Sequence, residues 1–373
     1  MVVIKKTALI YCEKEFGLVD GKTAAGLVRH SELYTIVGII DSSLAGQDAG
    51  EVLGDKKSNI PIFATLDESL SNLLEVPDCY IYGKAPLDTY ISTEERFLIL
   101  EAMGKGMDII NGLHQFFSED QEFAHMAVKC NIQIKDIRKP PKLKDSHVFT
   151  GQIYKVNVPV IAILGTDCAC GKMTTAVELN KALNNLGLKS VMIATGQTSL
   201  MQGAKYGASM DALVSQFAIG ELENAVVQAF EHENPDIILI EGQSAVSHPA
   251  FMSSIGILKG SVPDGVILQH PPARKFRCDF PDLVMPTVES EIQLIEAISQ
   301  SQVIAIALNH ENLTEDEIPK IIKDYEDRFC LPTTDVLNYG CQKLIRILSD
   351  RFPKLNQKIT RGRLEKMPLL AMR

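Results

Sequence analysis

The sequence predicts an α/β protein of two domains, each built on a mainly parallel sheet with helices on both faces. Short β-branched or apolar runs alternate with stretches of helical spacing along most of the chain, as in strand–helix–strand units. The chain has 373 residues, more than one domain usually contains. A glycine-punctuated turn at residues 165–175 lies between a predicted strand and a predicted helix, which is the setting of a phosphate-binding P-loop.

The first domain is predicted to cover residues 1–140. Buried strands are expected at 7–11, 35–41, 79–82 and 107–110, each ending near Gly, Asp or Asn. Helical spacing occupies residues 21–29, 66–74 and 93–103. Two prolines at 140 and 141 interrupt regular structure, so we expect a linker over residues 141–157.

The second domain is predicted to cover residues 158–340. Strands are expected at 160–164, 190–195, 237–240, 265–268 and 303–308, with helices at 172–186, 211–217, 223–230 and 289–298. The tail, 341–373, holds nine Lys or Arg against two acidic residues. It is expected to form a terminal helix with a solvated arm, or else a segment that docks on another subunit.

Composition and charge narrow the classes of function. Hydrophobic residues make up 46% of the chain and the net charge is −10, so a folded protein without a nucleic-acid partner is expected. No run of 18 apolar residues and no secretion signal is found, so we expect a cytoplasmic protein with no membrane partner. Eight cysteines without CxxC spacing indicate reduced thiols and predict no metal site.

The P-loop is the sharpest motif. Backbone N–H groups of its small residues can surround a phosphate, the following helix adds partial positive charge, and Lys172 adds a full charge. Five residues separate its glycines instead of four, and Met173 stands where Ser or Thr would ligate Mg²⁺. Phosphate binding is therefore better supported than metal-assisted phosphoryl transfer. The predicted cofactor-binding residues of the loop are Gly165, Thr166, Asp167, Gly171, Lys172, Met173, Thr174 and Thr175.

Polar residues at other predicted strand ends extend this site, because ligands of open α/β sheets bind at that edge. Glu241 could face a metal or act as a base, or simply cap a turn, and His248 on the next loop could act as a general base. Asn309 could pair with an adenine edge. The predicted substrate-binding residues are Gln197, Gln243, His270, Arg274 and Arg277; the two arginines could hold a carboxylate or phosphate, or form a solvated face.

These motifs, in this order, resemble the D-glutamate N-acetyltransferase family over roughly residues 5–340. The resemblance is carried by the P-loop with Met173, by Ala-Thr-Gly-Gln-Thr at 194–198, by Glu-Gly-Gln at 241–243 with Ser-His-Pro at 247–249, and by Ala-Leu-Asn at 307–309. N-terminal stretches at 20–23, 41–46, 48–50 and 111–114 add to it. The resemblance implies a Rossmann-like N-terminal domain, a P-loop NTPase-like domain and acetylation of the D-glutamate amine by acetyl-CoA.

The favoured function is thus an N-acetyltransferase with acetyl-CoA as co-substrate, an acidic amino acid as acceptor and Glu241 or His248 as the base. The P-loop domain is also similar to dethiobiotin synthetase, through Gly-Thr-Asp at 165–167 and the strand ending Glu-Gly at 241–242, so an ATP- and Mg-dependent ligase or small-molecule kinase is the alternative. A regulator that binds a nucleotide without turnover is a third. A homo-oligomer is expected. A dinucleotide cofactor is not, because no complete G-x-G-x-x-G is present.

Overall fold

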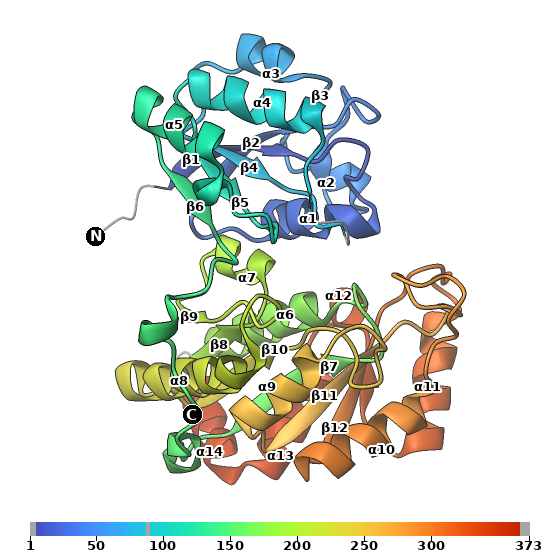
Figure 1. Ribbon diagram of the computed structural model, residues 1–373. Coiled ribbons are helices and arrows are strands. Elements are labelled where there is room, and N and C mark those ends of the chain that lie inside the picture. Colours follow the sequence, from blue (N-terminus) through green and yellow to red (C-terminus); the bar gives the residue numbers. More distant parts are fainter. Residues whose placement is uncertain (1–4, 87–89, 366–373) are drawn as a thin grey trace. The chain divides into compact units, whose positions relative to one another are not determined.

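The computed structural model describes residues 5–86 and 90–365, with side chains described up to 359. The chain divides into two compact units (Figure 1). The N-terminal unit contains the residues up to 141 together with 196–204, and the C-terminal unit contains 142–195 and the residues from 205 onward. Both units are α/β with parallel sheets, which confirms the predicted fold class.

The described part of the N-terminal unit holds a parallel sheet in the order β3-β2-β1-β4-β5-β6. The direction of strand succession reverses between β1 and β4, as in Rossmann-type sheets. The strands are β1 (Lys6–Tyr11), β2 (Tyr34–Ile40), β3 (Ile62–Phe63), β4 (Cys79–Tyr82), β5 (Asp108–Asn111) and β6 (Ile134–Asp136). The helices are α1 (Lys22–Arg29), α2 (Ala49–Val52), α3 (Leu66–Asn72), α4 (Thr93–Gly104) and α5 (Gln121–Cys130).

Helix α7 (Gln197–Gln202) also belongs to the N-terminal unit, although it follows a strand of the other sheet in the sequence. The side chain of Met201 is fully buried in a core cluster with Ile10 and Leu27. The Gln202 amide donates a hydrogen bond to the carbonyl oxygen of Gly26 (2.8 Å), and the N–H of Glu32 donates to the carbonyl oxygen of Gln202 (2.7 Å). Helix α7 therefore completes the core beside α1.

The C-terminal unit has a parallel sheet in the order β13-β12-β11-β7-β10-β8-β9 within its described residues. The strands are β7 (Val160–Gly165), β8 (Ser190–Ala194), β9 (Tyr206–Gly207), β10 (Ile237–Glu241), β11 (Gly265–His270), β12 (Val303–Leu308) and β13 (Thr333–Thr334). The helices are α6 (Lys172–Asn185), α8 (Ser215–Glu233), α9 (Ser253–Ser261), α10 (Val288–Ser299), α11 (Ile318–Phe329), α12 (Val336–Tyr339), α13 (Gln342–Arg351) and α14 (Pro353–Glu365).

Two apolar clusters cover the faces of this sheet. One is formed with α8, α9, α10 and α11, and the other with α6, α13 and α14. The basic tail is consequently more structured than predicted: its helices α13 and α14 bury Leu344, Leu348, Leu355 and Ile359 in the second cluster. The last part of the expected arm, 366–373, lies outside the described residues.

Helix α8 corrects one prediction. Residues 211–217 and 223–230 were expected as two helices, but a single helix starts at Ser215, and Asp211 lies in the turn before it. Gly220 within this helix is a point of close packing, because a Cβ there would lie 2.4 Å from the carbonyl oxygen of His147. The expected linker lies against the same helix: the N–H of Thr150 donates to the Glu223 carboxylate (2.5 Å).

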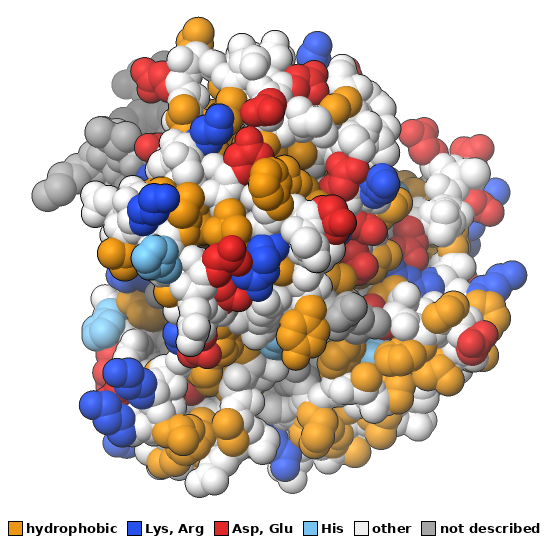
Figure 2. Space-filling view, turned by 45° about the horizontal axis from the view of Figure 1, so that its top comes forward, with side chains coloured by type: hydrophobic (Ala, Val, Ile, Leu, Met, Phe, Trp, Pro, Cys, Tyr) orange, Lys and Arg blue, Asp and Glu red, His pale blue; other side chains and the backbone are white. Residues whose placement is uncertain are grey.

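Among the described residues, no helix has the length and apolar character needed to cross a membrane. Acidic and basic side chains are interspersed on the face shown in Figure 2, together with scattered apolar ones.

Candidate functional site

The P-loop joins β7 to α6, as its sequence predicts. Gly171 has a φ of +105°, a left-handed conformation that L side chains rarely adopt, and it places the first residue of the helix at the end of the loop. The Lys172 side chain is buried, and its ammonium donates to the carbonyl oxygen of Asp167. The Thr175 hydroxyl donates to Gln269 of the neighbouring strand β11 (2.6 Å). A lysine charge and a helix N-terminus thus meet at the carboxyl edge of the sheet.

Arg274 forms hydrogen bonds to two residues of the P-loop. Its Nη1 donates to Oδ2 of Asp167 (2.8 Å) and to the carbonyl oxygen of Cys168 (2.7 Å). The other side of the guanidinium forms a bidentate pair with Glu311, at 2.7 Å for both bonds. Burial alone would raise the pKa of Asp167, but the N–H of Cys278 and the Arg274 charge outweigh burial, so its pKa is lowered and the carboxylate is ionised.

Arg277 has a different set of partners. Its Nη2 donates to the hydroxyl (3.0 Å) and the carbonyl oxygen (3.2 Å) of Ser247, and Nη1 lies 3.6 Å from Oδ1 of Asp167. The loop that carries Ser247 is held by Glu291, whose carboxylate accepts the N–H groups of Val246 (2.5 Å) and Ser247 (3.2 Å). Arg277 thus lies between the P-loop and the loop after β10.

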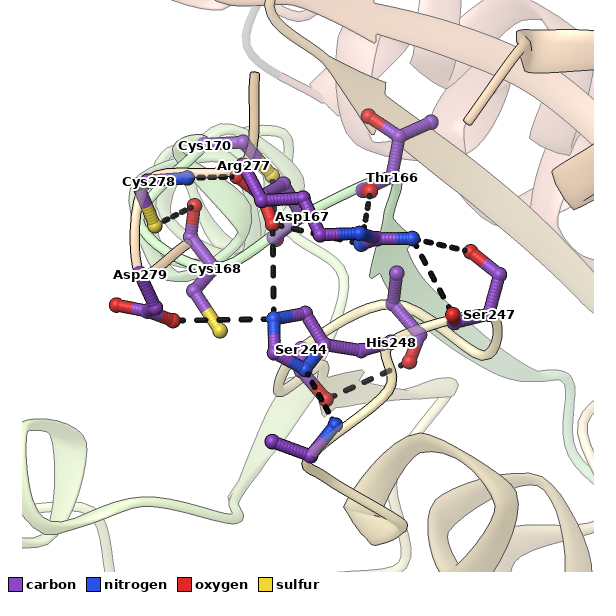
Figure 3. A network of polar contacts seen from close by, with 12 residues as sticks. Thr166, Asp167, Cys168, Cys170, Ser244, Ser247, His248, Arg277, Cys278 and Asp279 are labelled. Atoms are coloured by element: carbon purple, nitrogen blue, oxygen red, sulfur yellow. Dashed lines mark hydrogen bonds and ion pairs between the residues drawn. The ribbon is translucent and has the colours of Figure 1, made fainter. Parts of the chain in front are cut away.

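His248 faces the P-loop with a fully buried ring (Figure 3). Its Nδ1 accepts the N–H of Ala250 (3.3 Å), and the ring stacks on Phe251 with centroids 4.7 Å apart. Its Nε2 lies 3.9 Å from Oδ1 of Asp167 and 3.9 Å from Oδ2 of Asp279. Burial, followed by the Arg277 charge, lowers the pKa of His248, so the imidazole is neutral at pH 7.

Glu241 is the last residue of β10, and Gln243 lies two residues after it. Oε2 of Glu241 accepts the N–H of Thr195 (2.9 Å), and the Thr195 hydroxyl donates to the Glu241 carbonyl oxygen (2.9 Å). The Gln243 amide donates to the same hydroxyl (3.0 Å). Since β10 pairs with β7, these groups stand beside the P-loop strand.

His270 and Asn309 lie on the other side of β7. Nδ1 of His270 is 2.8 Å from the hydroxyl of Thr166, and burial lowers the pKa of His270 to about 4. The carbonyl oxygen of the Asn309 side chain accepts the N–H of Glu311 (3.0 Å). The contact with adenine that the sequence suggested for Asn309 stays a prediction.

Gln197 belongs to the N-terminal unit, whereas the other candidate site residues belong to the C-terminal unit. Its carbonyl oxygen accepts a hydrogen bond from Arg138 (2.8 Å), and its amide donates to the hydroxyl of Thr23 (3.3 Å). The hydroxyl groups of Thr23 and Thr198 are 2.9 Å apart. The structure thus gives Gln197 a role in joining α7 to its own unit.

Sequence reasoning missed several residues that complete the cluster. Asp279, Glu311 and Glu291 were not singled out, because each is a lone acid that meets its partners only in the fold. Asp279 had one signal, its position two residues after Arg277. A further group was not foreseen: one ligand atom each of Asp167, Cys168 and His248 lies within 4.8 Å of the others, an arrangement that could hold a metal ion.

Comparisons with known proteins give consistent results. A family model described as "Domain of unknown function (DUF1611_C) P-loop domain" matches residues 147–345, and its N-terminal counterpart, described as a Rossmann-like domain, matches residues 42–140. A D-glutamate N-acetyltransferase from Pseudoalteromonas sp is 30% identical over 254 residues, covering 66% of this chain and 74% of that one. Another from Tritonibacter scottomollicae is 26% identical over 275 residues, covering 72% and 80%.

A solved structure is similar over nearly the whole chain. The crystal structure of a DUF1611 family protein from Anabaena variabilis has a TM-score of 0.86 at 28% identity, covering 93% of this chain and all of that one. The fold of each unit is therefore shared with an experimentally determined relative.

Proposed function

Because the chain belongs to the DUF1611 family, in which it resembles D-glutamate N-acetyltransferases over about two thirds of its length, we propose that it transfers an acetyl group from acetyl-CoA to the amine of an acidic D-amino acid. The observation that carries the chemistry is a P-loop with its lysine and helix N-terminus in place, but with Met173 where the magnesium-ligating hydroxyl of phosphoryl-transfer enzymes stands.

The P-loop would hold the phosphates of CoA. Acetyl transfer leaves those phosphates intact, so the loop needs N–H groups and positive charge but no bound Mg²⁺. Lys172 and the N–H groups beside Gly171 supply both. Asn309 and Thr174 remain our candidates for further contacts with the nucleotide part.

The acceptor's carboxylate would bind to Arg277. Arg274 is less suited, because Asp167 and Glu311 already neutralise its charge. Arg277 donates to neutral groups of Ser247 and has only one longer ion pair, 3.6 Å to Asp167, so more of its charge is left for an anion than in Arg274. Gln243 and His270, at the ends of β10 and β11, are the neighbouring polar groups that we assign to substrate orientation.

The reaction needs a proton acceptor. The amine attacks the thioester carbonyl carbon, a tetrahedral oxyanion forms, the C–S bond breaks, and the thiolate leaves and takes up a proton. The ammonium must first lose its proton. We place this step at His248 and the two carboxylates that face it, Asp167 and Asp279. Glu241 is the other candidate, but its Oε2 is occupied by the N–H of Thr195.

The direct test incubates the purified chain with acetyl-CoA and D-glutamate and follows free thiol and acetylated product by mass spectrometry, with L-glutamate and ATP plus Mg²⁺ in parallel. We expect acetylation with D-glutamate and no magnesium requirement. Mg-dependent ATP turnover would favour the ligase or kinase alternative, which the Gly-Thr-Asp segment supports; binding of acetyl-CoA without turnover would favour a regulator.

The role of the loop is tested by titration calorimetry with acetyl-CoA. Lys172→Ala should weaken binding about 10- to 100-fold, since a charge-assisted contact to phosphate contributes roughly 1.5–3 kcal/mol. Lys181→Ala is the matched control, because Lys181 is an exposed lysine of the same helix α6 and pairs with Glu178. Equal affinities of the two variants would refute the assignment.

A further inference from the structure

We propose that Asp167, Cys168 and His248 form a binding site for one divalent transition-metal ion, with zinc as the best match, and that the Asp279 carboxylate faces this site. The four residues come from the P-loop, the loop after β10 and the loop after β11. Figure 3 shows the His248 ring between the two carboxylates, with Cys168 beside them. This inference deepens the proposed function, on which its catalytic part rests, but the binding site itself is independent of that function.

The distances favour a metal over direct hydrogen bonds. Nε2 of His248 lies 3.9 Å from an oxygen of each aspartate, too far for a hydrogen bond. Around a tetrahedral ion with bonds of about 2.0–2.3 Å, ligand atoms are separated by roughly 3.3–3.7 Å. The ligand atoms of Asp167, Cys168 and His248 lie within 4.8 Å of one another, so shifts of about 1 Å would bring all three onto one ion and leave a fourth position open for water.

Two of the atoms involved have no hydrogen bond among the described residues, although Arg277 lies 3.6 Å from one of them, Oδ1 of Asp167. Oδ1 of Asp167 and Nε2 of His248 are fully buried without a hydrogen bond. A buried polar atom left unsatisfied costs roughly 1–3 kcal/mol, so a pair of them aimed at one point indicates a bound group. A metal ion at that point would satisfy both.

The surroundings orient the ligands, as supporting residues do in known metal sites. Oδ2 of Asp167 is held by Arg274 and by the N–H of Cys278, which leaves Oδ1 as the free atom. The ring of His248 packs against Phe251 and Phe280, with centroids 4.7 and 5.7 Å away. Asp167 and His248 are therefore restrained before any ion binds.

The donor set selects the kind of metal. Imidazole, carboxylate and thiol together suit zinc or cobalt, whereas magnesium and calcium prefer oxygen ligands only. The Cys168 thiol must lose its proton on binding, so uptake releases a proton. Two carboxylates and a thiolate supply three negative charges, which compensate a dication beside Arg277.

In the proposed reaction, such an ion would supply a hydroxide at neutral pH, since zinc lowers the pKa of bound water to about 7. The hydroxide takes the proton of the substrate ammonium, leaving bound water and a neutral amine. His248 then acts through the metal as a ligand and not as the base itself.

The test uses the full chain, stripped with a chelator and reloaded with Zn²⁺ or Co²⁺. We expect about one ion per chain by elemental analysis and a thiolate-to-cobalt charge-transfer band. Cys168→Ser should abolish the band, and His248→Ala should weaken binding at least about 100-fold. Cys278→Ser is the matched control, because that thiol belongs to the same loop cluster but is not among the proposed ligands. Substoichiometric binding, or binding unchanged in both ligand variants, overturns the proposal.

A second measurement, nitrogen NMR of His248, uses the wild-type protein, so its result does not depend on whether the variants fold. The N–H of Ala250 makes Nδ1 of His248 an acceptor, so the metal-free neutral ring carries its proton on Nε2. Metal binding at Nε2 moves that proton to Nδ1, which nitrogen NMR detects. No tautomer change on saturation with Zn²⁺ refutes the site. Acetyl transfer by metal-free protein would refute the catalytic role of the metal and leave the proposed function intact. Stoichiometric metal binding without acetyl transfer would support the metal site and refute the proposed function.

Discussion

Helix α7 allows a sharp test of how the chain is partitioned. Met201 lies between β8 and β9 in the sequence, yet its side chain is fully buried in the core of the N-terminal unit. Met201→Ala removes most of this side chain from a packed site. We therefore expect the N-terminal unit to lose stability, while the unit that contains β8 and β9 keeps its own.

The magnitude follows from the complete burial of Met201. Truncation of a buried Met to Ala destabilises by about 2–5 kcal/mol, and the contacts of α7 with Gly26 and Glu32 remain, so we take about 3 kcal/mol. Since about 1.4 kcal/mol corresponds to a factor of ten, opening of the N-terminal unit should become about 100-fold more populated.

Hydrogen–deuterium exchange with mass spectrometry reads the two units separately. Peptides from β1 and β4 should exchange about 100-fold faster through unit opening, with little change in β7 and β10. Met192→Ala is the matched control, because Met192 lies on β8 and packs against a core cluster of the C-terminal unit. It should have the opposite pattern. Faster exchange in β7 and β10 of Met201→Ala, with β1 and β4 unchanged, would refute the assignment of α7.

Three further predictions concern the site. Gly171→Ala forces an L residue to a φ of +105° and places its Cβ 3.3 Å from Gln269, which costs about 1–3 kcal/mol of strain. The affinity for acetyl-CoA, measured by calorimetry, should therefore fall about 5- to 150-fold. The circular dichroism spectrum should stay unchanged. His270 has a pKa of about 4 in the folded state against 6.5 in the unfolded state, so the unfolded state binds the proton first as the pH falls. The free energy of unfolding should therefore fall by about 3 kcal/mol between pH 6.5 and pH 4. Urea titrations over this pH range should find a smaller fall in His270→Asn. A wild-type slope in that variant would contradict this cause. Glu291→Ala leaves the buried N–H of Val246 and the half-buried N–H of Ser247 without an acceptor, and the buried one alone is a loss of roughly 1–3 kcal/mol. The melting temperature of this variant should therefore drop clearly below that of Glu291→Gln, which keeps an acceptor oxygen. Equal melting temperatures would show that these bonds do not hold the loop.

Local patterns in the sequence were sufficient for the fold class and for the phosphate loop. A buried parallel strand is a short apolar run whichever strand it pairs with, so it can be recognised in the sequence. The P-loop is one contiguous segment, residues 165–175, so its motif is also visible without the fold. Family membership could be recognised in the same way, because the order of short motifs along the chain is preserved without knowledge of the fold.

Features that join distant segments could not be read in this way. Instead of the two helices expected at 211–217 and 223–230, one helix forms and packs at Gly220 against the chain around His147, and the basic tail holds apolar residues for a sheet face. Gln197 was predicted to bind substrate, and the fold also gives its side chain a contact that joins α7 to the rest of the N-terminal unit. Such outcomes depend on which surfaces bury one another, a property of the whole chain that no local window contains.

The strongest example is the arrangement of His248 between Asp167 and Asp279. In the sequence these are a loop histidine, a P-loop acid and an acid after a basic cluster, and each has an ordinary structural explanation. Folding brings β7, β10 and β11 side by side, so their carboxyl ends converge and three separate loops meet. The sequence determines which polar side chains follow each strand. The order of the strands in the sheet determines which of those side chains lie close to one another.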